Sequence, residues 1–210
     1  MYTSIDNFEA EYQKFNDETI QGYNNEIKKY SLAISNGDKS TETLARLFLA
    51  YEGLYQFVKN DKKSQIVTKD TVDRVCDNFL AKVEQEVVQG KNLADNYCYL
   101  AHIATYKKDN QKALEYYNKA VEIDEKTLMN RAVFKNNELN DRQGALEDYN
   151  RALSIENDPE ERKIIQHLIN NIDLIRDSDS LLRNINIQVW AIIILIIAYV
   201  VYEVYKIFFS

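Results

Sequence analysis

Few side chains in this sequence have the types and spacing that catalysis or metal binding requires. The two histidines, His102 and His167, lie far apart, and the two cysteines, Cys76 and Cys98, lack the close Cys or His neighbours of a zinc site. The sequence contains no glycine-rich phosphate loop and no G-x-S-x-G or H-E-x-x-H motif. We therefore expect no catalytic residues, no metal site and no cofactor, and we predict that the protein is not an enzyme.

The charge of the chain narrows the range of partners. Its 210 residues include 26 Lys and Arg against 33 Asp and Glu, which gives a formal net charge of −7. The densest basic stretch runs from Lys59 to Lys63 and is interrupted by Asp61. Because nucleic-acid binding requires a clustered basic surface, we expect no nucleic-acid partner.

Composition predicts an all-α protein, because five glycines and one proline leave few of the residues that turns between strands use. Apolar residues at three- and four-residue spacing predict three helices in an N-terminal helical region, residues 1–90, at about 4–35, 41–59 and 68–89. The connections between these helices are short and polar, and this favours antiparallel helical hairpins.

The first of these helices carries an apolar stripe that slips once near its middle. The stripe consists of Ile5, Phe8, Tyr12, Phe15, Ile20, Tyr23, Ile27, Tyr30 and Ile34. A stripe of bulky side chains either packs within its own domain or forms the seam of a coiled-coil dimer. We therefore keep a homo-oligomer among the expected partners.

An internal repeat follows the N-terminal region. Residues 112–124, KALEYYNKAVEID, return as residues 144–156, GALEDYNRALSIE. The residues shared at i, i+4 and i+7 are Ala113, Tyr117 and Ala120 in the first copy and Ala145, Tyr149 and Ala152 in the second. This spacing places them on one helical face, where small residues let a neighbouring helix come close. Such a unit cannot bury its face alone, so we expect stacked helices.

The repeated residues resemble the tetratricopeptide repeat (TPR) family. In the first copy, Tyr97, Leu100 and Ala101 stand where the family has the aromatic, leucine and small residue of its first helix. In the second copy, residues 130–132 and 138–141 are similar to the first helix and turn of the family. The resemblance implies two repeats within residues 91–158, each built from two antiparallel helices, in a TPR-like solenoid.

The second copy departs from the family spacing at two places. One residue is inserted between Ala132 and Ala145, and the link from Ala120 to Ala132 is three residues shorter than usual. We therefore expect the first helix of the second copy to be short or tilted.

The resemblance also implies a binding site, because the first helices of such repeats line a concave surface that holds a peptide or a partner helix. The side chains implied at this surface are Cys98, Tyr99, His102, Tyr106, Met129, Asn130 and Val133. Aromatic and methionine side chains suit an apolar anchor, and His102 and Asn130 suit hydrogen bonds to a peptide backbone. An alternative interpretation packs Tyr99 and Tyr106 against the helix at 68–89.

A further helix is predicted in residues 159–184, which also contain a linker. Asp158 is a suitable N-cap, Pro159 suits the first helical position, and two acids follow in the first turn. The apolar residues of this helix would cap the end of the solenoid. They are Ile164, Ile165, Leu168, Ile169 and Ile172.

Residues 185–210 are predicted to be a single transmembrane anchor. Residues 185–202, INIQVWAIIILIIAYVVY, contain no charged residue, and a helix of roughly 18 residues spans ~27 Å, close to the thickness of a hydrocarbon core. The side chains expected at the membrane interfaces are Trp190, Tyr202, Tyr205 and Lys206. A core or oligomerisation helix of a soluble protein is the alternative, although few such helices are apolar on every face.

The N-terminus lacks the basic stretch and apolar core of a signal peptide and carries Asp6. We therefore predict a tail-anchored single-pass membrane protein whose N-terminal domain is cytoplasmic. The expected function is that of a membrane-tethered TPR-like adaptor or scaffold that binds a protein partner or peptide through its concave face. The alternative is a structural subunit of a membrane protein complex, assembled through its transmembrane helix.

Overall fold

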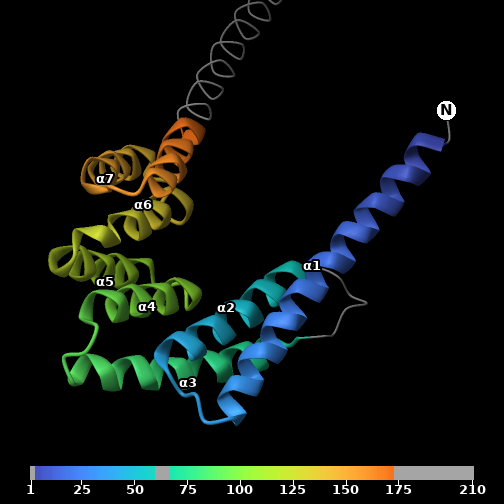
Figure 1. Cartoon of the computed structure of the whole chain (residues 1–210), viewed down its shortest axis with the longest axis horizontal. Helices are drawn as coiled ribbons and strands as arrows, with labels where there is room; N and C mark the ends of the chain where they lie inside the picture. The colour runs from blue at the N-terminus through green and yellow to red at the C-terminus, as the bar shows by residue number, and fades with distance from the viewer. Residues whose placement is uncertain (1–2, 60–66, 173–210) are drawn as a thin grey trace, which may run out of the picture. The chain divides into compact units, whose positions relative to one another are not determined.

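The computed structural model describes residues 3–59 and 67–172, and it contains no strand in these ranges. The helices are α1 (Thr3–Ser35), α2 (Thr41–Val58), α3 (Lys69–Val88), α4 (Leu93–Tyr106), α5 (Asn110–Ile123), the 3₁₀ helix η1 (Glu125–Thr127), α6 (Leu128–Asn137) and α7 (Arg142–Ile155) (Figure 1). A further helix covers residues 159–172. The predicted all-α class is confirmed for these residues, and the three predicted N-terminal helices agree with α1, α2 and α3 within one residue at each end.

The ends of the first helices follow from local hydrogen bonding. Ser40 begins α2 as an N-cap, because its side chain accepts a hydrogen bond from the amide of Thr43 at 3.2 Å. The turn before it contains Gly37, whose φ of 98° lies in the left-handed region that favours glycine. The amide of Asp38 donates to the carbonyl of Ala33 at 3.0 Å, which satisfies an unpaired group at the end of α1.

The described residues fall into two compact units that divide between Thr127 and Leu128. The first unit contains α1 to α5 and η1, and the second contains α6, α7 and the helix at residues 159–172. The division lies between the two predicted repeats, inside the predicted repeat region 91–158.

The core of the first unit is built from α2, α3 and α4. Its most enclosed side chains are those of Phe48 and Leu54 of α2 and of Val72, Cys76, Phe79 and Val83 of α3. The rings of Phe48 and Phe79 lie 5.8 Å apart, and α4 closes this core with Leu100 and Ile103. Burial raises the pKa of the Cys76 thiol to about 11, so this side chain is a neutral core residue near neutral pH.

The C-terminal half of α1 packs on the first unit. Ile27, Tyr30 and Ile34 contact the core, and Tyr23 lies so close to Gly53 of α2 that a Cβ added there would lie 2.5 Å from the tyrosine ring. This part of the apolar stripe therefore packs within its own domain, which was one of the two predicted alternatives. On the other side of the slip, α1 runs past the end of α2, and Phe15 is 61% exposed (Figure 1).

The repeated residues pack as their spacing predicts. Buried positions of the first copy are Ala113, Tyr117 and Ala120, and the matching buried positions of the second copy are Ala145, Tyr149 and Ala152. The first helix of the second pair, α6, has 10 residues where α4 has 14, so the predicted shortening is confirmed. The short link before α6 is taken up by η1.

The helix at residues 159–172 begins where the sequence predicts. The Oδ1 atom of Asp158 accepts hydrogen bonds from the amides of Glu160 and Glu161 at 2.8 and 3.1 Å. On the predicted apolar face, Ile165 and Ile172 are buried, whereas Ile164 is 49% exposed.

Within the two ranges described above, no helix is both long enough and apolar enough to cross a membrane. The predicted anchor, residues 185–210, lies outside the described residues, and so does the predicted linker that precedes it. The residues predicted at the membrane interfaces also lie outside the described residues; they are Trp190, Tyr202, Tyr205 and Lys206.

Candidate functional site

Four of the predicted partner-contacting side chains lie along α4, and a buried amide fixes the start of this helix. Asn96 is 1% exposed, and its Nδ2 donates to the carbonyl of Lys91 at 2.8 Å and to Oε2 of Glu86 at 3.3 Å. Asn92 caps the helix in a left-handed conformation without a side-chain hydrogen bond. The bonds of Asn96 therefore hold the first turn of α4 against the end of α3.

Tyr99 is the first of the predicted side chains to contact the N-terminal helices. Its ring meets Phe79 of α3 edge to face at 5.3 Å, and its hydroxyl donates to Oε2 of Glu42 on α2 at 2.9 Å. Burial, followed by the hydrogen bond to Glu42, raises the pKa of Tyr99. The hydrogen bonds from Arg46 and then Tyr99 lower the pKa of Glu42, so a neutral phenol meets an ionised carboxylate at neutral pH.

Tyr106 makes similar contacts at the C-terminal end of α4. Its ring meets Phe48 edge to face at 5.3 Å, and its hydroxyl donates to Oδ1 of Asp73 on α3 at 2.6 Å. Burial and then the Asp73 carboxylate raise the pKa of this tyrosine. The alternative interpretation, in which both tyrosines pack against α3, is therefore confirmed for the ring of Tyr99, whereas Tyr106 bonds to α3 through its hydroxyl and packs its ring on Phe48 of α2. Contact of either tyrosine with a partner stays a prediction.

His102 and Cys98 complete the set on α4. The Nε2 atom of His102 lies 2.9 Å from Oε2 of Glu52 on α2, and its ring meets Phe48 edge to face at 5.7 Å. The His102 side chain is 36% exposed, and Cys98 is half-buried. His102 thus combines a partly exposed ring with a polar atom that Glu52 holds in place.

The other three predicted side chains lie on α6 in the second unit. Asn130 is exposed, Met129 is half-buried, and Val133 is 38% exposed. The structure therefore brings the seven predicted residues together as two sets, one along α4 and one along α6. Each set stands within its own unit.

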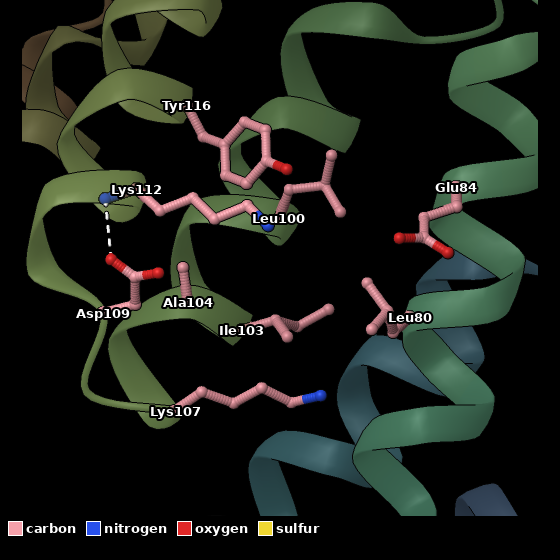
Figure 2. A pocket seen from close by; sticks show the side chains of 9 residues that line it. All are labelled: Leu80, Glu84, Leu100, Ile103, Ala104, Lys107, Asp109, Lys112 and Tyr116. Atoms are coloured by element: carbon pink, nitrogen blue, oxygen red, sulfur yellow. Dashed lines mark hydrogen bonds between the residues drawn. The ribbon is translucent and has the colours of Figure 1, made fainter.

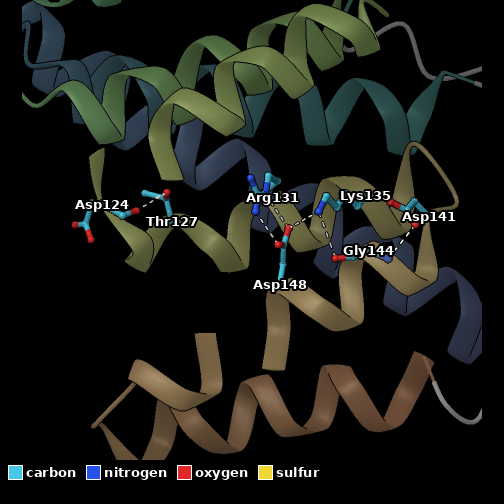
Figure 3. Close-up of polar contacts among 7 residues, drawn as sticks. All are labelled: Asp124, Thr127, Arg131, Lys135, Asp141, Gly144 and Asp148. Carbon is cyan, nitrogen blue, oxygen red and sulfur yellow. Dashed lines mark hydrogen bonds and ion pairs between the residues drawn. The ribbon is translucent and has the colours of Figure 1, made fainter. Parts of the chain in front are cut away.

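A buried carboxylate ties α6 to α7, and sequence reasoning missed it (Figure 3). Asp148 is 5% exposed. Arg131 donates to both of its oxygens at 2.8 and 2.7 Å, and the ammonium of Lys135 lies 2.9 Å from Oδ2. Burial alone would raise the pKa of Asp148, but the hydrogen bonds from Arg131 and Lys135 lower it below its ordinary value. This cluster is structural, because all three side chains are largely enclosed.

The signal for this cluster lay in the comparison of the two copies. Asp148 occupies the position that Tyr116 holds in the first copy, within the aligned segments EDYN and EYYN. Tyr116 stacks on Tyr97 with ring centroids 6.1 Å apart. An acid in place of a packed aromatic predicts a buried basic partner, and Arg131 supplies it.

A groove between α3 and the α4–α5 pair is a second feature that sequence reasoning missed (Figure 2). Its cavity volume is about 150 Å³. Its floor consists of Leu80 of α3 and Leu100, Ile103 and Ala104 of α4. Figure 2 shows Leu80 and Ile103 pointing toward each other across it. Because α3 and α4 present these residues from separate parts of the sequence, no single periodic pattern indicates the groove.

Charged side chains stand around this floor. They are Glu84 of α3 and Lys107, Asp109 and Lys112 near the α4–α5 turn, with Tyr116 of α5 beside them (Figure 2). Asp109 caps α5, because its Oδ1 accepts from the amide of Lys112 at 3.0 Å. The ammonium of Lys107 lies 3.2 Å from Oδ1 of Asp77 on α3. The Lys112 ammonium lies 5.7 Å from the centre of the Tyr116 ring.

No three His, Cys, Asp or Glu side chains converge as a metal site requires in the part of the chain that the structure describes. Comparison with known families gives a match on α4, α5 and η1. Residues 94–127 match the family model of the tetratricopeptide repeat. No curated protein matches the chain. The first predicted repeat is thus supported by sequence and fold, and this class of helical repeat is a scaffold for protein–protein interaction.

Proposed function

We propose that this protein is a membrane-tethered scaffold whose helical repeats bind a protein partner. The observation that carries the proposal is the α4–α5 pair, which matches the tetratricopeptide repeat and is followed by a second pair, α6–α7, with the same residues buried. Within each pair, the two packed helices offer a helical face to which a partner segment can bind. Each unit presents its own side chains to a partner: the half-buried His102 on α4 in the first unit, and Asn130 and Val133 on α6 in the second.

The partner surface is tested by affinity purification of the full chain from detergent-solubilised cells, with quantitative mass spectrometry. The test variants are His102→Ala and Val133→Asp, which leave the buried contacts of Tyr99 and Tyr106 in place. Ile164→Asp is the matched control, because Ile164 is also a partly exposed aliphatic residue but lies on another helix. Partners that are lost with a test variant and kept with the control support a binding site on the helix that this variant changes, α4 for His102→Ala and α6 for Val133→Asp. If every partner survives both test variants, neither helix face is the binding site.

The tether in this proposal is the uncharged run at residues 185–202. A cytoplasmic domain held in this way meets membrane partners at a raised local concentration, so weak contacts suffice. Replacing the run by an unrelated transmembrane helix separates the two expected functions. A scaffold keeps its partners after the exchange, whereas a structural subunit assembled through its own transmembrane helix loses them.

A further inference from the structure

We propose that the groove between α3 and the α4–α5 pair is a docking site for a protein segment that presents one large apolar side chain between an acidic and a basic residue. The proposal rests on the proposed function as a protein-binding scaffold and adds a site outside the seven predicted residues. It is carried by three observations: the size of the cavity, its apolar floor, and the opposite charges on its two walls (Figure 2).

The size of the cavity sets the size of the anchor. An apolar cavity of about 150 Å³ accommodates a benzene-sized group, and the groove has this volume. Leu100, Ile103 and Ala104 on the floor are each at most 6% exposed. Because they are packed in the core, the floor is already formed and does not need to rearrange when a ligand binds. A phenylalanine side chain therefore matches the groove in both size and polarity.

The charges on the walls set the residues that flank the anchor. Glu84 stands on the α3 wall, and Lys112 stands on the α5 wall. Among the residues that the structure describes, neither has an oppositely charged group within ion-pair distance. The other two rim charges are already engaged, because Lys107 pairs with Asp77 and Asp109 caps α5.

A segment with an acid beside Lys112 and a base beside Glu84 complements both walls at once. Two positive or two negative flanking residues would each place one charge against a wall of the same sign. A like-charge contact of this kind weakens the binding of that peptide, so the groove discriminates against it. The occupant is thus a zwitterionic segment with a central aromatic or large aliphatic anchor.

The test uses the full chain in nonionic detergent micelles, with isotope-labelled isoleucine and leucine methyl groups observed by NMR. The probes are blocked tripeptides, namely acetyl-Asp-Phe-Lys-amide, acetyl-Asp-Ala-Lys-amide, acetyl-Lys-Phe-Lys-amide and acetyl-Asp-Phe-Asp-amide. We expect saturable shifts of the Ile103 and Leu80 methyl signals with Asp-Phe-Lys, and at least roughly tenfold weaker binding of Asp-Ala-Lys, because a buried phenyl group is lost. Asp-Phe-Lys should also bind more tightly than Lys-Phe-Lys, although the chain carries a net charge of −7 and would attract the more basic peptide without a specific site.

A charge-reversal variant makes this test decisive. Glu84→Lys places a positive charge on both walls, so the preferred probe should change from Asp-Phe-Lys to Asp-Phe-Asp. Glu122→Lys is the matched control, because Glu122 is exposed on α5 and does not line the groove, and it should keep the original preference. Glu84 is exposed, so the variant should fold, and unchanged methyl spectra without peptide would establish this.

The proposal is overturned if no probe gives saturable shifts at these methyl groups, if Asp-Ala-Lys binds as tightly as Asp-Phe-Lys, or if Glu84→Lys leaves the preference unchanged. These outcomes are independent of the test of the proposed function, because the peptides are measured without any cellular partner. Conversely, partners lost with His102→Ala and Val133→Asp would keep the proposed function even if the groove binds none of the peptides.

Discussion

Asp148 is the residue whose environment departs most from what its neighbours in the sequence indicate. It lies on a polar-looking helix, yet it is buried and held by Arg131 and Lys135. Removing one partner of a buried ion pair leaves uncompensated charges, and this costs about 3 kcal/mol or more in the free energy of unfolding. The two basic side chains on α6 would then lose the carboxylate that they share.

We therefore predict that Asp148→Asn lowers the stability of the α6–α7 pair by about 3 kcal/mol. Hydrogen exchange of backbone amides in α6 and α7 measures this loss locally in the full chain. Glu147→Gln is the matched control, since Glu147 is the preceding residue and is exposed. Equal protection in the two variants would show that the ion pairs do not stabilise the helix pair.

The stabilisation by Asp148 should depend on pH. Its pKa in the folded chain is lowered from 3.8, so the folded state favours the ionised form. Its contribution is therefore present above about pH 4 to 5 and is lost as the pH falls through the lowered value. We predict that the difference in thermal stability between the unmodified chain and Asp148→Asn shrinks when the pH is lowered from 6 toward 3, as followed by circular dichroism. A difference that grows in this range would contradict the sign of the pKa shift.

Sequence reasoning at the residue scale succeeded where a side chain had one role and failed where it had two. The Ala, Tyr and Ala positions of both copies follow from spacing alone, because small and aromatic residues on one face have to be buried. Tyr99 and Tyr106 are ambiguous in sequence, since an amphipathic ring suits a partner as well as a neighbouring helix. Glu42 and Asp73 decide between these environments, and they lie on helices that no local pattern connects to α4.

At the scale of elements, the contact between α1 and α2 depends on a glycine. Tyr23 occupies the space that a Cβ on residue 53 would need. We predict that Gly53→Ala displaces this ring and weakens the attachment of α1 by about 1–3 kcal/mol, as overpacking does. Limited trypsin proteolysis at Lys28 and Lys29, which are exposed in α1, should then become faster.

The control for this change lies on the opposite helix. Gly22 also sits in a helix, but a Cβ added there meets no atom within 4 Å. Gly22→Ala should therefore leave proteolysis unchanged or slow it slightly, because alanine favours a helix by up to about 1 kcal/mol over glycine. If both variants are cleaved at the same rate, close packing at residue 53 does not hold α1 in place.

The lengths of the elements were predictable because their end signals are local. Gly37 and Asp158 mark helix ends through their own backbone or side-chain chemistry, and the shortened α6 follows from a count of residues between repeated positions. The groove at Leu80 and Ile103 was not predictable. It forms where α3 and α4 meet, and the pairing of helices across such a gap is set by packing of the whole unit.

At the scale of the whole molecule, we expect the predicted anchor, and not the acidic helices, to attach the protein to a membrane. Removing residues 185–202 leaves the net charge unchanged, because that run contains no charged residue. We predict that the full chain floats equally well with neutral and anionic vesicles and stays bound in 1 M NaCl, because burial of apolar residues is insensitive to screening.

Vesicle flotation in a density gradient measures this association, and deletion of residues 185–210 should abolish it. Release by salt, or a strong preference for anionic vesicles, would indicate attachment through surface charges in place of an apolar span. The same deletion variant should retain most of its helical circular dichroism signal, because α1 to α7 bury apolar residues through contacts with one another within their own units.

The tyrosine–carboxylate pairs of α4 also restrict how this protein can be chemically modified. The hydroxyls of Tyr99 and Tyr106 each donate to an ionised acid, Glu42 on α2 and Asp73 on α3. A phosphoryl group on either oxygen would remove the donated proton and add a charge of about −1.5 to −2 beside that carboxylate. Phosphorylation of either tyrosine is therefore incompatible with the packing of α4 on α2 and α3. Repulsion between the phosphate and the carboxylate would push α4 away from these helices.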